Sequence, residues 1–159
     1  MIKGVLLDLA GVLYNGDRAI PGAARAVDRL RKSGLPVRFL TNSTRSPRRV
    51  LLERLRGMGF DVEPHEVFTP ASAAVDLLQA RGLEAHLLIH PDLAEDFEGV
   101  RGSGRGKAVV VGDAGPYFTY EALNSAFRVL AEGAEFLALA ANRSFRDADG
   151  ELSMDAGAF

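Results

Sequence analysis

Short apolar segments alternate with helical segments bounded by proline and glycine through the first half of this sequence. Three stretches lack helical periodicity and predict buried strands: residues 5–10, 37–42 and 66–68. Three others have a proline near the start, a glycine at the end and apolar residues at helical spacing: residues 21–34, 46–59 and 69–82. Strands and helices interleaved in this way predict βαβ units and a mainly parallel sheet. Residues 1–82 therefore have the pattern of the opening half of a doubly wound, Rossmann-like α/β domain.

The rhythm changes after residue 82. Three further stretches are strand-like: residues 85–90, 108–112 and 136–142. One helix is predicted over 119–133, with apolar residues on one face, and residues 146–150 (RDADG) predict a turn. Residues 83–153 are therefore expected to form a second, smaller α/β unit.

Composition excludes several classes of partner. The 159 residues are 47% hydrophobic and 25% charged, as in ordinary soluble proteins, and the net charge of −2 gives no field that attracts nucleic acid or an anionic membrane. The absence of cysteine excludes disulfides and thiolate metal sites. Because no apolar stretch is long enough to span a membrane and the chain enters a strand almost at once, we expect no signal peptide and a cytoplasmic location.

Asp8 ends the first predicted strand, and Gly11 and Gly16 make the segment after it prone to turn. In open α/β sheets, ligands bind outside the carboxyl ends of the strands. Asp8 is therefore a candidate functional residue; the alternative is that its carboxylate caps a turn.

Thr41 and Asn42 end the second predicted strand, which is expected to lie beside the first. A carboxylate such as Asp8 can attack phosphorus and can also bind Mg²⁺, which prefers oxygen ligands. A hydroxyl and free backbone N–H groups nearby can hold phosphoryl oxygens, and such positioning supplies most of the catalysis in phosphoryl transfer. The pair of strand ends favours this chemistry, although TNST taken alone is more often a plain turn.

Several ordered segments resemble the haloacid dehalogenase superfamily of phosphatases. LLDLAGVLYNG resembles its first motif, Asp-x-Asp-Gly-Thr/Val-Leu, and RFLTNST resembles its second. LLIHPDLAEDF, VVVGDAGPYFTYEALNSAFRVL and DGELSMDAGAF resemble the 4-nitrophenylphosphatase branch, in which a large cap domain follows the second motif. The resemblance implies a core half at 1–82, a cap at 83–153 and a return to the core from 154–159. It also implies that the C-terminal part of the core is missing from this stretch.

The resemblance further implies roles for individual residues. Asp8 would be the nucleophile and a Mg²⁺ ligand, and the backbone carbonyl of Ala10 a second ligand. Gly11, Thr41 and Asn42 would bind the phosphoryl group. The implied substrate is a small phosphorylated compound, and relatives of this kind often form homodimers through their caps.

Ala10 departs from the family pattern, because the family's second aspartate stands at this position. In most members that carboxyl protonates the leaving group and activates water, which a methyl group cannot do. Positioned acid–base catalysis is typically worth ~10²–10⁴-fold in rate. Substrates with good leaving groups would suffer least from its loss.

A second departure concerns the lysine and aspartates of the family's third and fourth motifs, which lie beyond the cap. Lys107 and Asp113 are superficially similar, but only one strand separates them, so we assign both to the cap. Without these motifs the 159 residues are expected to be an incomplete enzyme.

Other polar segments carry weaker signals. GSGRGK is not a P-loop, since it lacks the glycine spacing and precedes a strand. His65, His86 and His90 are too scattered for a metal cluster. Asn142 and Arg143 end a strand of the second unit, where they face the substrate or are plain surface residues.

Three functions stay open. The leading hypothesis is a Mg²⁺-dependent phosphatase acting through an aspartyl-phosphate on Asp8. The second is a catalytically impaired protein with a binding or regulatory role, which Ala10 and the absent motifs favour. The third is a phosphotransferase or mutase that passes the phosphoryl group to an acceptor other than water.

Overall fold

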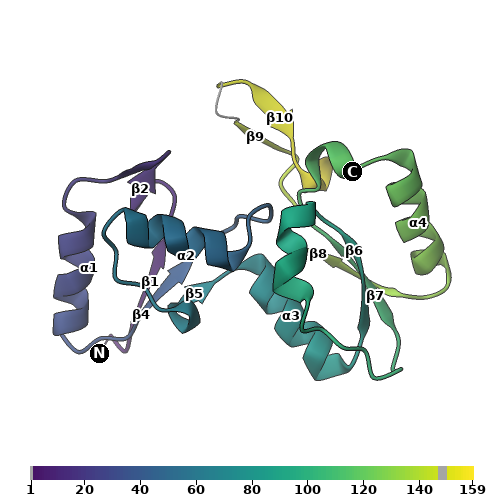
Figure 1. Cartoon of the computed structure of the whole chain (residues 1–159), viewed down its shortest axis with the longest axis horizontal. Coiled ribbons are helices and arrows are strands. Elements are labelled where there is room, and N and C mark those ends of the chain that lie inside the picture. The colour runs from purple at the N-terminus through teal and green to yellow at the C-terminus, as the bar shows by residue number, and fades with distance from the viewer. Residues whose placement is uncertain (1, 147–149) are drawn as a thin grey trace. The chain divides into compact units, whose positions relative to one another are not determined.

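The computed structural model describes residues 2–146 and 150–159 of the chain. They form two compact α/β units, which we describe separately (Figure 1). The first unit comprises Met1–Asn42 with Arg48–Thr69, and the second comprises Ser43–Pro47 with Pro70–Phe159. The predicted fold class, α/β with parallel sheets, is confirmed.

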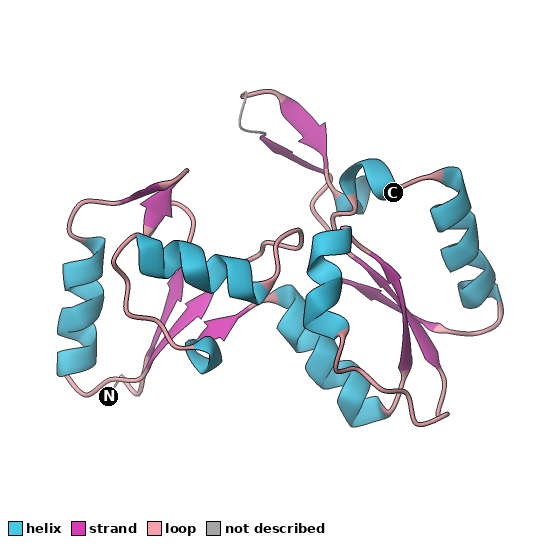
Figure 2. Ribbon diagram, in the orientation of Figure 1, coloured by secondary structure: helices cyan, strands magenta, loops and turns pink. Residues whose placement is uncertain are grey.

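The first unit is built on a parallel three-stranded sheet in the order β1–β4–β5 (Figure 2). Its strands are β1 (Val5–Asp8), β4 (Val37–Leu40) and β5 (Val67–Phe68), and its helices are α1 (Ala23–Lys32) and α2 (Arg48–Gly57). Strand β1 ends at Asp8, two residues before the predicted end, and β4 ends before Thr41 and Asn42, which the sequence pattern had included. The 3₁₀ turn η1 (Pro64–Glu66) leads into β5.

One face of this sheet carries the core of the first unit. Phe39 and Val67 point to this face and pack with Val27 of α1 and Leu55 of α2. Burying such apolar side chains is the main favourable term in folding. Both helices therefore cover the same face, as expected for successive right-handed crossovers that move in one direction across a sheet.

The opposite face is largely uncovered. Leu6 of β1 and Phe68 of β5 point to it, with side chains 67% and 49% exposed. Parallel sheets are normally covered on both faces. The first unit therefore has half of the usual doubly wound arrangement.

A short hairpin follows β1 and was not predicted. Its strands are β2 (Tyr14–Asn15) and β3 (Arg18–Ala19), which pair antiparallel around Gly16. Gly16 has a φ of +54°, which glycine adopts without steric cost. The Asn-Gly pair between alternating residues is a hairpin signal that our loop assignment overlooked.

The second unit has a parallel sheet in the order β6–β7–β8. Its strands are β6 (Glu84–Leu88), β7 (Lys107–Val111) and β8 (Glu135–Ala138). Helix α3 (Pro70–Arg81) and the 3₁₀ segment η2 (Pro91–Phe97) cover one face. Helix α4 (Tyr120–Ala131) lies on the other.

The compact units divide differently from the expected boundary at residue 82. Ala74 and Leu78 of α3 are buried against Leu93 and Val110 of the second unit's core, so α3 belongs to that unit. The proline and glycine punctuation predicted the helix but carried no information on which sheet it covers.

The end of the second unit contains further short elements. Strands β9 (Ser144–Arg146) and β10 (Leu152–Met154) form an antiparallel hairpin, followed by the 3₁₀ turn η4 (Ala156–Ala158). A similar turn, η3 (Gly115–Tyr117), precedes α4. The turn predicted at 146–150 has its centre, residues 147–149, outside the described residues.

Candidate active site

The candidate site lies at the carboxyl edge of the sheet in the first unit. Asp8 is the last residue of β1 and pairs in register with Leu40, the last residue of β4. Thr41 and Asn42 follow directly. Since neighbouring strands lie about 4.8 Å apart, the three polar residues share one edge of the sheet. The predicted adjacency of the two strand ends is confirmed.

The Asp8 side chain is exposed at this edge. Its Oδ1 accepts a hydrogen bond of 2.7 Å from the backbone N–H of Leu9, whose own side chain is fully buried. The buried leucine fixes the backbone, and the hydrogen bond orients the carboxylate. The carboxylate thus caps the turn.

The backbone after Asp8 folds back on itself in a tight loop. The amide of Leu13 donates to the carbonyl of Leu9 at 2.8 Å, and the amide of Gly11 donates to the carbonyl of Tyr14 at 2.8 Å. Gly11 has a φ of +78°, where a residue with a Cβ would be strained. The bridge between Ala10 and Tyr14 uses the Leu9 carbonyl and the Gly11 amide, so the Ala10 carbonyl takes no part in it.

Thr41 is held by the neighbouring strand. Its backbone N–H donates to the carbonyl of Phe68 at 3.2 Å, and its side chain is half-buried. Asn42 is exposed and closes the first segment of this unit. These two residues are positioned by β4 and β5, and Asp8 by β1.

Tyr14 is a site neighbour that the sequence analysis missed. It is buried, and the Arg54 guanidinium lies over its ring, 4.8 Å from the centroid. Burial raises the pKa of Tyr14 above its ordinary value, the Arg54 charge partly opposes this, and the nearby Asp8 carboxylate adds to it. The phenol therefore stays protonated beside the carboxylate. The sequence signal that could have identified Tyr14 is its position directly before the Asn15-Gly16 turn.

The donors at this edge suit a hard cation such as Mg²⁺. No cluster of three or more His, Cys, Asp or Glu side chains fit for a metal occurs in the described residues. The edge instead offers the Asp8 carboxylate and the Ala10 carbonyl. Mg²⁺ is commonly held by one or two carboxylates together with water and substrate phosphate, so this sparse set of oxygen ligands fits it.

Lys107 and Asp113, which the sequence analysis set aside, lie in the second unit. Lys107 is exposed at the start of β7 and Asp113 follows its end, so they lie at opposite ends of one strand. Asp113 is buried, with its amide donating to Thr44 Oγ1 at 3.1 Å and its carboxylate 3.7 Å from the Arg45 guanidinium. At about 3.3 Å per residue, Lys107 and Asp113 cannot meet at one site.

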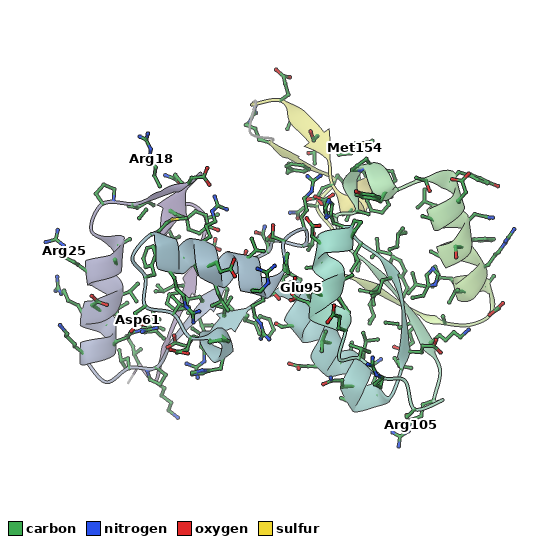
Figure 3. The ribbon with its side chains drawn as sticks, viewed as in Figure 1. Arg18, Arg25, Asp61, Glu95, Arg105 and Met154 are labelled. Carbon is green, nitrogen blue, oxygen red and sulfur yellow. The ribbon has the colours of Figure 1, made fainter. Side chains whose placement is uncertain are left out.

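Two of the three histidines also have local partners. His90 Nδ1 lies 3.5 Å from the Asp92 carboxylate, and the His86 ring lies 3.5 Å from Ser125 Oγ. Several of the abundant arginines, such as Arg18 and Arg25, extend into solvent, as expected for a charged surface (Figure 3).

Comparison with known proteins identifies the family. The family model described as haloacid dehalogenase-like hydrolase matches residues 5–114. The match includes both strand ends of the candidate site and most of the second unit's sheet. The chain belongs to the haloacid dehalogenase-like hydrolases.

Two curated relatives refine the comparison. The chain is 46% identical to the phospholysine phosphohistidine inorganic pyrophosphate phosphatase of Danio rerio, over 99% of this chain and 60% of the relative. It is 40% identical to the human haloacid dehalogenase-like hydrolase domain-containing protein 2, again over 99% and 60%. The chain thus spans about three fifths of the length of these relatives.

Solved structures support the same family. The 4-nitrophenylphosphatase of Thermotoga maritima has a TM-score of 0.86 at 26% identity, covering 99% of this chain and 61% of that one. NagD from E. coli has a TM-score of 0.82 at 27% identity, with coverage of 99% and 62%. The branch expected from the motifs is confirmed. In the described part of the chain, no helix is both long and apolar enough to cross a membrane.

Proposed function

We propose that the whole protein is a Mg²⁺-dependent phosphatase that hydrolyses a small phosphorylated compound through an aspartyl-phosphate on Asp8. The observation that carries the proposal is the register of β1 and β4, which brings an exposed carboxylate beside the Thr41–Asn42 strand end. Family membership and the phosphatase names of the relatives support it.

Each residue at the edge has a task in this proposal. The Asp8 carboxylate attacks phosphorus, and the bond to the leaving oxygen breaks. Water then attacks the aspartyl-phosphate and releases phosphate. Thr41 and Asn42 hold the phosphoryl oxygens with hydroxyl, amide and backbone donors, and Gly11 lets the loop backbone approach them. The Asp8 carboxylate and the Ala10 carbonyl would hold a Mg²⁺ ion, which would neutralise phosphoryl charge when bound.

The second unit is proposed as the cap that selects the substrate. Caps of this kind sequester a reaction from water. We also place the protein in the cytoplasm and propose that two copies pair through their caps. The residues at the sheet edge contact only the phosphoryl group. Selectivity for the rest of the substrate must therefore come from residues outside this edge.

Ala10 supports a second candidate, a binding or regulatory protein with impaired catalysis. Its methyl group supplies no proton, and Tyr14, with its raised pKa, is a weaker acid than an ordinary tyrosine. Catalytic turnover of a phosphoramidate or aryl phosphate, whose leaving groups need less assistance, separates the two candidates.

The test is Asp8→Asn in the protein expressed from the whole reading frame. An amide cannot attack phosphorus, so hydrolysis of an aryl phosphate with Mg²⁺ should fall by more than about 10²-fold while the circular dichroism spectrum is unchanged. Asp17→Asn, a change to an exposed carboxylate in the β2–β3 turn, is the matched control and should retain activity. Activity in Asp8→Asn above a few per cent contradicts the assignment of the nucleophile.

A further inference from the structure

One arginine of α2 contacts three residues of the hairpin that follows β1. The Arg54 guanidinium lies over the Tyr14 ring, 4.8 Å from its centroid. Its Nη2 also donates to the carbonyl of Gly16 and, at 2.9 Å, to the Asp17 carboxylate. Arginine can make these contacts together, because its planar guanidinium stacks on an aromatic face and carries several N–H donors in a fixed arrangement. One side chain therefore joins α2 to strand β2 and to the turn after it.

Helix α2 is a firm support for these contacts. Leu51, Leu52 and Leu55 of this helix are buried in the core of the first unit. Arg54 is exposed and lies outside that buried face. Because the buried leucines fix the helix, its arginine can hold the hairpin in one place.

Tyr14 connects the hairpin to the candidate site. Its side chain is buried, and its carbonyl accepts a hydrogen bond of 2.8 Å from the Gly11 amide. The backbone of Gly11 and the carbonyl of Ala10 are the loop groups assigned above to phosphoryl and Mg²⁺ binding. A displacement of the Tyr14 ring would therefore move the acceptor that fixes this part of the loop.

The contact with Asp17 contributes least to this arrangement. The Asp17 side chain is 96% exposed, and ion pairs between exposed groups stabilise a protein little. Asp17→Asn also keeps a side-chain oxygen that can accept a hydrogen bond from Arg54, which agrees with its use above as a control. The Tyr14 ring and the Gly16 carbonyl are therefore the contacts that matter.

We propose that Arg54 is a positioning residue, which holds Tyr14 and the β2–β3 turn so that the preceding loop presents the Ala10 carbonyl and the Gly11 backbone at the carboxyl edge of the sheet. In this role Arg54 acts through Tyr14 and contacts no reacting atom. The catalytic consequence rests on the proposed function, while the structural part concerns the loop alone.

Hydrogen exchange tests the structural part without any activity. Arg54→Ala removes the guanidinium and does not weaken the helix, because alanine is the best helix former. In the metal-free protein expressed from the whole reading frame, the Gly11 amide should exchange at least about fivefold faster in this variant, since the loop opens more often. Amides of β4 should be unchanged. Arg49→Ala is the matched control, because Arg49 is exposed on the same helix and pairs with Glu53 at 3.0 Å.

Arg54→Lys separates geometry from charge. Lysine keeps the positive charge but lacks the planar guanidinium, so it cannot stack on Tyr14 and donate to Gly16 in the same way. Both Arg54→Lys and Arg54→Ala should raise the Mg²⁺ concentration for half-maximal hydrolysis of an aryl phosphate about tenfold. The thermal midpoint should stay near that of the parent. Excess Mg²⁺ should restore most of the rate, which a loss of folded protein would not allow.

Three outcomes overturn or redirect the proposal. A Gly11 exchange rate or a Mg²⁺ response that is the same in Arg54→Ala as in the parent overturns it. A parent-like Mg²⁺ response in Arg54→Lys also overturns it, because the charge alone would then account for the effect. A parent protein that hydrolyses no phosphate ester contradicts the proposed function instead, and the exchange rates still decide whether Arg54 holds the loop.

Discussion

Position 10 determines which phosphate esters the proposed enzyme can hydrolyse quickly. With Ala10 no proton reaches the leaving group from this position, so the rate should depend steeply on leaving-group basicity. Aryl phosphates, phosphoramidates and pyrophosphate should react much faster than alkyl phosphates. Ala10→Asp should raise kcat/KM for alkyl phosphates by part of the ~10²–10⁴-fold that acid catalysis supplies. The gain is limited by repulsion between the new carboxylate and Asp8.

The measurement is kcat/KM across a series of esters, plotted against the pKa of the leaving group for both forms. Ala10→Ser is the control, because its hydroxyl is polar but a weak acid, and it should leave the slope near that of the parent protein. Equal slopes for the parent and Ala10→Asp would show that another group already supplies the proton.

Tyr14 gives a prediction on stability at high pH. Burial raises its pKa above the ordinary value of about 10, so the folded state favours the neutral phenol. The resulting stabilisation is complete below pH 10 and is lost as the pH rises through the raised pKa of the folded state. Tyr14→Phe keeps the ring beneath Arg54 but cannot ionise, so its unfolding free energy should fall less steeply above pH 10.

Urea unfolding between pH 8 and pH 11 measures this slope. Tyr120→Phe is the control, since Tyr120 is 77% exposed. A Tyr14→Phe variant whose stability declines as steeply as that of the parent would assign the loss to other groups.

At the scale of elements, the sequence predicted what repeats along the chain and missed what depends on tertiary packing. Apolar runs and Pro/Gly punctuation located the parallel strands and four α-helices, because these signals are local. The adjacency of Asp8 and Thr41 followed from strand order. Helix α3 was expected with residues 1–82 and packs in the second compact unit, because proline and glycine punctuation carries no information on which sheet a helix covers. Tyr14 was missed because only the folded loop brings it near Asp8.

The two faces of β1 and β4 should differ sharply in their tolerance of truncation. Phe39 is fully buried beneath α1 and α2. Phe39→Ala leaves a cavity, so it should lower the free energy of unfolding by about 3–5 kcal/mol. Leu6 lies on the uncovered face, so Leu6→Ala should change the unfolding free energy by less than about 1 kcal/mol. Urea unfolding followed by circular dichroism compares them. Similar losses for both would mean that the outer face is covered in solution.

Each of the two units exposes large apolar side chains. In the first unit Leu6 and Phe68 are open to solvent, and in the second Phe127 and Phe136 are 65% and 60% exposed. Exposed patches of this kind usually mark a surface that another segment or molecule covers.

The 159-residue chain on its own is therefore expected to self-associate. Light scattering should show a mean mass that rises with concentration, and thermal unfolding should be broad and followed by aggregation. The double variant Leu6→Lys with Phe68→Lys should reduce this association, because each lysine replaces exposed apolar surface with a charge. Val12→Lys, which changes an exposed valine in the loop after β1, should not. A parent chain that stays monomeric at all concentrations and unfolds in one sharp transition would show that both sheets are stable with one face uncovered, and would contradict the view that these units need further polypeptide.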